Sequence, residues 1–140
     1  MNDLHALYRG TIRRHAADPT GYRRGIEATH RCEGHNPQCG DRVEIFLQLA
    51  DGIIEDIAFD GEACTICMAS ASLLCENLAG QAVATVDAMA RALEKRLKGP
   101  DPPDDDDPLA PLQGVRPYPS RIQCATLPWE TAQRALASEL

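Results

Sequence analysis

The clearest hydrophobic pattern in the chain is an alternation that begins at Val43. Apolar residues at 43, 45, 47 and 49 are separated by Glu44, Phe46 and Gln48, and a second β-rich run ends at Phe59. Alternation with a period of two is typical of a strand with one buried face. The letters ADG separate the two runs, and the glycine can take the positive φ of a tight turn. The stretch therefore predicts a β-hairpin.

Helical periodicity predicts most of the remaining structure. The predicted helices cover residues Asp3–Ala17, Thr65–Gly80, Thr85–Gly99 and, with an irregular first part, Ser120–Leu140. Thr85 is the expected N-cap of its helix, and Pro128 fits near the first turn of the last segment. A weaker edge strand is predicted at Glu27–Cys32. Helix, strands and then helices predict a single α+β domain over residues 1–140, with about three antiparallel strands packed against helices.

The segment Pro100–Pro111 interrupts this pattern with prolines and aspartates, and it predicts a solvated loop without a packed core. The loop also explains the charge of the chain. Removing the five negative charges of its aspartates from the net charge of −7 leaves −2. A nearly neutral body with an acidic loop repels a phosphate backbone, so nucleic acid is not an expected partner.

The length of 140 residues suits one hydrophobic core. We find no apolar run long enough to cross a bilayer and no opening of the signal-peptide kind. We therefore expect a cytoplasmic protein with no membrane partner. In a reducing compartment the six cysteines point to metal binding or catalysis rather than to disulfides.

Three cysteines occupy related places in the predicted fold. Cys39 lies on the loop before the hairpin, Cys64 lies just after it at a helix start, and Cys124 lies near the start of the last helix. The outer ends of paired strands are neighbours, so Cys39 and Cys64 come within reach of each other. Asp41 either adds a carboxylate or is an ordinary turn residue. Three sulfurs and one oxygen suit tetrahedral zinc, and the same thiolates could hold iron and sulfide.

The other candidates have simpler alternatives. Cys67 and Cys75 fit small buried hydrophobic positions on a helix, although Cys67 could be a spare thiol near the site. Cys32 is either structural or a thiol that exchanges sulfur with Cys39. His35 is either solvated or able to reach the metal or act as a base. Gly40 would let the backbone pass close to an ion.

Three separated motifs occur in a specific order. They are NPQCGD (36–41), GEAC (61–64) followed by the small-residue run MASAS (68–72), and RIQCATLPW (121–129). Together they resemble the iron–sulfur cluster assembly family that includes IscU, SufU and the N-terminal part of NifU. The likeness covers residues 4–135. Within the family the chain is more similar to SufU, because Gln123 stands where IscU-type proteins carry a histidine, while Arg121 and the 100–111 insertion fit SufU.

The resemblance implies a function and a site. Cys39, Asp41, Cys64 and Cys124 would bind zinc, and Cys39 would take a persulfide sulfur from a SufS-like, PLP-dependent cysteine desulfurase. Arg121 would help to dock that partner, and SufBCD-like assembly machinery would act downstream. Whether such a sulfurtransferase-like protein is an enzyme stays open. One alternative is an IscU-type scaffold that assembles a [2Fe–2S] cluster, and another is a structural zinc adaptor.

Overall fold

The computed structural model describes residues 3–137. The chain forms, in order, α1 (Asp3–Ala17), β1 (His30–Asn36), β2 (Asp41–Ala50), β3 (Ile53–Glu62), α2 (Thr65–Leu78), α3 (Ala84–Lys98), a 3-10 helix η1 (Ala110–Val115) and α4 (Pro119–Ala135). The strands form one antiparallel sheet in the order β1-β2-β3. The predicted α+β class is therefore confirmed, as is the three-stranded sheet. Residues 138–140 of the predicted last helix lie outside the described residues.

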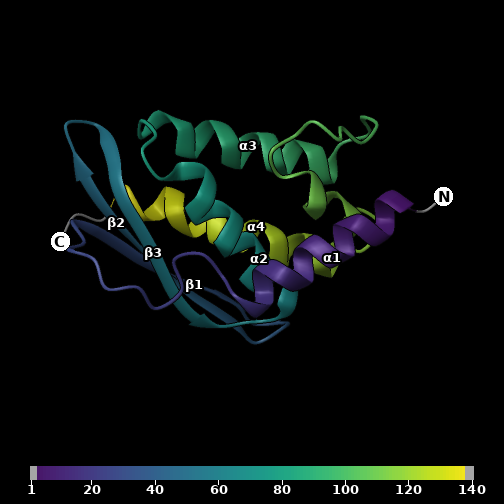
Figure 1. The fold of residues 1–140 in the computed structure, drawn as a ribbon, viewed down its shortest axis with the longest axis horizontal. Helices are drawn as coiled ribbons and strands as arrows, with labels where there is room; N and C mark the ends of the chain where they lie inside the picture. Colours follow the sequence, from purple (N-terminus) through teal and green to yellow (C-terminus); the bar gives the residue numbers. More distant parts are fainter. Residues whose placement is uncertain (1–2, 138–140) are drawn as a thin grey trace.

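The helices are stacked against the sheet in layers (Figure 1). Helix α4 contacts β1 and β2, and α2 contacts β3. Farther out, α1 packs on α2 and α3 packs on α4. Every second residue of β2 is fully buried from Val43 through Ile45 to Leu47, so the alternation in the sequence is the alternation of the sheet's two faces. Within residues 3–137, no helix combines the length and apolarity needed to cross a bilayer.

The predicted β2–β3 hairpin is confirmed. Asp51 and Gly52 both have positive φ, at 53° and 76°, which is the requirement of the tight hairpin turn that favours Asp-Gly. The first helix also has its predicted bounds. Gly80 follows the end of α2 with φ of 81°, as expected for a glycine after a helix.

The prediction for β1 was wrong in position. The strand is not Glu27–Cys32 but His30–Asn36, and it pairs with β2 from His30 opposite Leu47 to Asn36 opposite Asp41. Cys39 therefore lies in the turn of a first hairpin, β1–β2, whereas the sequence predicted a loop before a single hairpin, β2–β3. Residues 33–36 of the strand were missed because the inward face there carries Gly34 instead of a large apolar residue. A Cβ on Gly34 would lie 2.1 Å from Oγ1 of Thr131, so the glycine lets α4 approach β1.

Two helix details were also wrong. Helix α3 begins at Ala84, and its N-cap is Val83, which has no side chain to cap the helix. Pro128 lies well inside α4 rather than in its first turn. Proline has no backbone N–H, so it cannot donate a helical hydrogen bond to the carbonyl of Cys124, four residues earlier. Buried residues on both sides of Pro128 hold the helix together across this defect.

The acidic segment is more anchored than expected. It has no helix or strand up to Leu109, but Ala110 and Pro111 already belong to η1. Leu109 is buried in the core. Arg96 lies 3.8 Å from carboxylate oxygens of both Asp104 and Asp107. The segment is thus exposed over its aspartates and packed at its end.

Candidate metal centre

Three side chains from distant parts of the sequence meet at one end of the sheet. Cys39 comes from the β1–β2 turn, Asp41 from the first residue of β2, and Cys124 from α4. Their ligand atoms all lie within 4.8 Å of one another. Cys64, the N-cap of α2, adjoins this group, with its sulfur 3.5 Å from Oδ2 of Asp41. The structure therefore brings together the predicted donors, with Cys64 outside the tightest set.

The Cys39 turn is held by Asn36. The Asn36 carbonyl accepts hydrogen bonds from the backbone N–H groups of Cys39 and Gly40, at 3.2 and 2.9 Å. Its Oδ1 accepts a third from Gln38, at 3.2 Å. Gly40 takes a φ of 73°, and an added Cβ would meet nothing within 4 Å. The turn's backbone angle therefore favours glycine here, and no protein group crowds the position.

Asn36 is a residue of the site that the sequence reasoning missed. Its side chain is buried, and its Nδ2 donates to the sulfur of Cys124 at 3.8 Å. It thus ties the Cys39 turn to α4 by way of a second candidate ligand. Asparagine at the start of a proline-containing turn was the available signal, because its side chain often bonds nearby backbone amides.

Asp41 is more than a local turn residue. It is only 2% exposed, and its Oδ1 accepts a hydrogen bond of 2.8 Å from the backbone N–H of Cys64. This bond joins the start of β2 to the start of α2, across 23 positions of sequence. A carboxylate at this depth is costly unless it is hydrogen-bonded or paired with a cation.

The cysteine sulfurs, like the Asp41 carboxylate, are costly to ionise in this buried position unless a cation is nearby. Cys124 is 2% exposed, and its sulfur lies 3.4 Å from that of Cys39. Burial, together with hydrogen bonding to Asp41 and the neighbouring thiols, raises the pKa of Cys124. Burial also raises the pKa of Cys64. Thiolates are therefore disfavoured here unless a cation offsets the loss of water.

The donor set fits a zinc ion. Thiolates at about 2.3 Å from a tetrahedral zinc lie about 3.8 Å apart, which is close to the separation of Cys39 and Cys124 sulfurs. Sulfur and carboxylate oxygen are both ligands that zinc accepts. Cys39 is exposed whereas Asp41 and Cys124 are buried, so the centre opens to solvent on the Cys39 side.

The remaining candidates lie at the edge of the site or away from it. Cys67 is fully buried in a small apolar cluster with Cys124. Cys75 is buried in the main core, farther along α2. Cys32 lies on β1 and its thiol faces the carbonyl of Glu33. His35 is exposed, with Nε2 3.6 Å from a carboxylate oxygen of Glu33.

Arg121 is exposed at the start of α4. Its guanidinium carbon lies 4.8 Å from the centre of the Tyr118 ring. A guanidinium has no atom that could hold a cation, so Arg121 is an exposed surface group three residues before Cys124 and not a metal ligand.

Comparison with known proteins defines the class. The family model of the NifU-like N-terminal domain matches residues 7–138, and the chain belongs to this family. It is 34% identical over 140 residues to the zinc-dependent sulfurtransferase SufU of Bacillus subtilis (strain 168), covering 98% of this chain and 94% of the relative. It is also 34% identical over 113 residues to the iron–sulfur cluster assembly scaffold protein IscU of Thermotoga maritima, covering 79% and 78%.

Solved structures agree with the sequence comparison. The crystal structure of a candidate iron–sulfur cluster assembly scaffold protein for the SUF system from Fervidobacterium islandicum AW-1 has a TM-score of 0.81 and 27% identity. It covers 94% of this chain and 98% of that one. The family predicted from the three cysteine motifs, including its SufU branch, is confirmed.

Proposed function

We propose that this protein serves iron–sulfur cluster assembly as a zinc-bound acceptor of sulfur, and that Cys39 is the accepting residue. The observation that carries the proposal is the exposed thiol of Cys39, 3.4 Å from the buried sulfur of Cys124. An accessible nucleophile beside a sheltered donor set can react without dismantling the whole site. The SufU relative, named as a zinc-dependent sulfurtransferase, supports the same function.

The accepting step needs only a thiolate on Cys39. Its sulfur attacks the terminal sulfur of a persulfide on the donor protein. A new S–S bond forms on Cys39, the S–S bond of the donor breaks, and the donor cysteine leaves as a thiolate. No net oxidation or reduction occurs, because one persulfide replaces another.

The buried residues prepare that thiolate. Zinc bound by Cys39, Asp41, Cys64 and Cys124 would keep the thiols deprotonated at neutral pH. Asn36 holds the turn that presents Cys39, and its bond to Cys124 maintains the alignment of turn and helix. Asp41 links the same turn to α2 through the Cys64 amide.

The proposed donor is a SufS-like, PLP-dependent cysteine desulfurase, with SufBCD-like machinery downstream in the cytoplasm. Arg121 is the proposed docking residue, because it is exposed and lies one turn before Cys124 on α4. The Pro100–Pro111 segment is proposed as a SufU-type insertion within the single domain. Its aspartates are exposed except for the half-buried Asp107.

Metal analysis and a desulfurase assay on the same purified sample test this function. We expect about one zinc per chain and faster cysteine turnover by the desulfurase. Cys39→Ser should fold normally but gain no sulfur by intact-protein mass spectrometry. A protein that neither holds zinc nor accelerates the desulfurase would refute the proposal. If Cys39→Ser instead loses its fold together with its activity, the structural zinc adaptor is the better interpretation.

A scaffold role is the second candidate, and the IscU relatives favour it. The same cysteines would then hold a transient [2Fe–2S] cluster, with Asp41 aiding its release. Anaerobic reconstitution followed by absorption and Mössbauer spectra separates the two functions. A cluster that depends on Cys39, Cys64 and Cys124 supports the scaffold, and its absence rules the scaffold out.

A further inference from the structure

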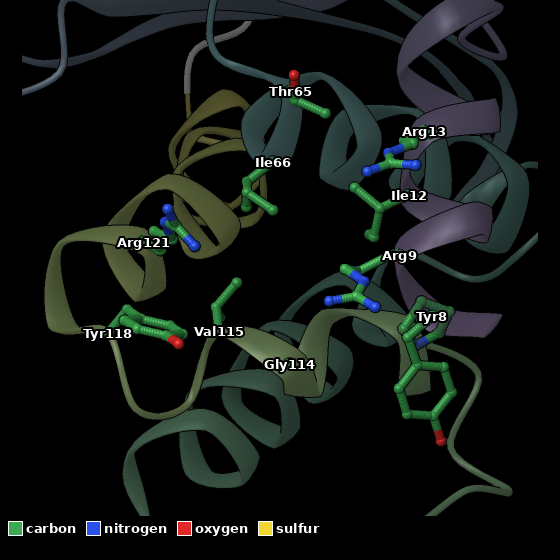
Figure 2. Close-up of a pocket in the computed structure, with 11 residues that line it drawn as sticks. Tyr8, Arg9, Ile12, Arg13, Thr65, Ile66, Gly114, Val115, Tyr118 and Arg121 are labelled. Carbon is green, nitrogen blue, oxygen red and sulfur yellow. The ribbon is translucent and has the colours of Figure 1, made fainter. Parts of the chain in front are cut away.

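A cavity of about 250 Å³ is lined in part by residues that neighbour Cys64 and Cys124 in the chain. We call it the arginine pocket, and it is lined by residues of four helices: α1, the start of α2, η1 and the start of α4. Its walls include Arg9, Arg13 and Arg121 (Figure 2). In Figure 2, Arg9 and Arg13 project from α1 on one side and Arg121 stands across the cavity from them.

The positive charge of the pocket is not balanced by the side chains of residues 8–137. None of these lining residues is acidic, and no salt bridge among the side chains of residues 8–137 involves Arg9, Arg13 or Arg121. This is a local reversal in a protein whose net charge is −7. The pocket is therefore complementary to an acidic group from outside the chain.

The nearby acidic segment does not supply that group. Asp104 and Asp107 lie against Arg96, and Asp105 accepts a hydrogen bond from the Tyr8 hydroxyl at the edge of the pocket. None of these aspartates lines the cavity. The three arginines are thus not paired with these aspartates, and their charge is available to a ligand.

The floor of the pocket is apolar. Ile12, Ile66 and Val115 lie between the arginines in Figure 2, and Tyr118 forms part of the rim with 50% of its surface exposed. An apolar floor contributes nothing to the binding of a small inorganic anion. The combination suits a group that brings an apolar side chain together with carboxylates, and the volume is below the range usual for cofactor sites.

The pocket is lined by residues of both helices that carry cysteines of the metal centre, α2 and α4. Thr65 and Ile66 directly follow Cys64, and Arg121 precedes Cys124 by one turn of α4. A segment seated in the pocket would be held next to these two cysteines. Such a position is useful to a protein that must bring its own reactive sulfur to Cys39.

We propose that the arginine pocket is a docking site for the sulfur-donating partner, which inserts an apolar side chain flanked by carboxylates. The inference rests on the proposed function and extends it from Arg121 to Arg9, Arg13 and the apolar floor. The arginines speed the encounter by attracting the acidic segment, and the floor slows its release.

Charge reversal on α1 tests the proposal. The variant Arg9→Glu/Arg13→Glu is compared with Arg14→Glu/Lys95→Glu, which changes the net charge equally at two exposed positions outside the pocket. Binding of each zinc-loaded protein to the desulfurase is measured by surface plasmon resonance at low and high salt. We expect the pocket variant to bind about tenfold more weakly, mainly through slower association, and to lose most of its salt dependence.

Two further readouts make the result specific. Zinc content and the maximal rate of sulfur transfer at saturating partner should stay at the wild-type level, so that only the apparent KM rises. Tyr118→Ala should weaken binding even at high salt, because its contribution is apolar.

The outcomes separate the two proposals. Equal affinities of the pocket variant and the charge-matched control overturn the docking site, while sulfur acceptance by the wild type leaves the proposed function standing. A wild-type protein that neither binds the desulfurase nor accepts sulfur overturns both.

Discussion

Helix α2 carries cysteines at both ends, and their surroundings are opposite in kind. Cys64 caps the start of the helix, half-buried beside the carboxylate of Asp41. Cys75, near the other end, is 2% exposed within the apolar core, where it packs against Gly21. The same residue type therefore offers a metal ligand at one end and a small hydrophobic group at the other. The difference comes from the neighbours of each cysteine and from the place of Cys64 at the N-cap of the helix.

The largest expected effect is at the metal end. Cys124→Ser should lower bound zinc from about one per chain to a small fraction and abolish sulfur acceptance, because a buried ligand is lost from the centre. Metal analysis and mass spectrometry of the persulfide measure these losses. Cys32→Ser is the matched control and should keep both properties. Full zinc occupancy in the Cys124→Ser protein would remove Cys124 from the ligand set.

A steric change at the Cys75 end should reduce stability without affecting the metal. Gly21 has φ of 84°, and an added Cβ would lie 2.6 Å from the sulfur of Cys75. We expect Gly21→Ala to cost about 2–4 kcal/mol in the free energy of unfolding, from backbone strain and overpacking together. Urea titration measures this loss.

A second substitution identifies the source of that loss. Gly21→Ala/Cys75→Ala should recover part of the stability, because the closest atom in the clash is gone. Gly25→Ala, where an added Cβ meets nothing within 4 Å, should be nearly neutral. If the double variant is no more stable than the additive sum of the single ones, the two residues do not clash as described.

Alkaline pH should lower the free energy of unfolding through Cys75, at the apolar end of α2. Burial raises the pKa of Cys75 to about 12 from its ordinary 9.0. Its contribution to stability is complete below pH 9 and is lost as the pH rises through 12, because the unfolded chain ionises first. Between pH 9 and 10.5 we expect a loss of about 2 kcal/mol. In Cys75→Ala, the free energy of unfolding from denaturation curves should not show this part of the loss. If it falls between pH 9 and 10.5 as steeply as in the wild type, Cys75 is not the source.

The smallest effect is expected at Cys67, one turn along α2 from Cys64. Cys67 is fully buried and lies in the same apolar cluster as Cys124, so we expect it to act by packing. Cys67→Ala should cost about 1 kcal/mol of stability and leave zinc content unchanged. A clear loss of zinc from a folded Cys67→Ala protein would place Cys67 among the ligands, and the metal end would then extend one turn farther along the helix.

The elements that could be predicted from the sequence are those whose signals are local. The alternation from Val43 and the Asp-Gly turn predict β2 and β3, and the order of the three cysteine motifs predicts the family. The strand signals survive in the structure because they depend on residues close to one another in the chain. Each cysteine motif is likewise a short local run, and the order of the three runs along the chain indicates the family. The strand signals failed at β1, where the inward residue Gly34 is explained only by the distant Thr131.

The surroundings of each cysteine depend on contacts that form when the chain folds. Cys39 and Cys124 are 85 positions apart, yet their sulfurs are 3.4 Å apart, and Asn36 reaches Cys124 from the turn that holds Cys39. The arginine pocket likewise joins α1 to α4. Sequence periodicity does not predict these contacts between distant segments. The burial of a residue, its pKa and the charge around it depend on segments that come together only when the chain folds.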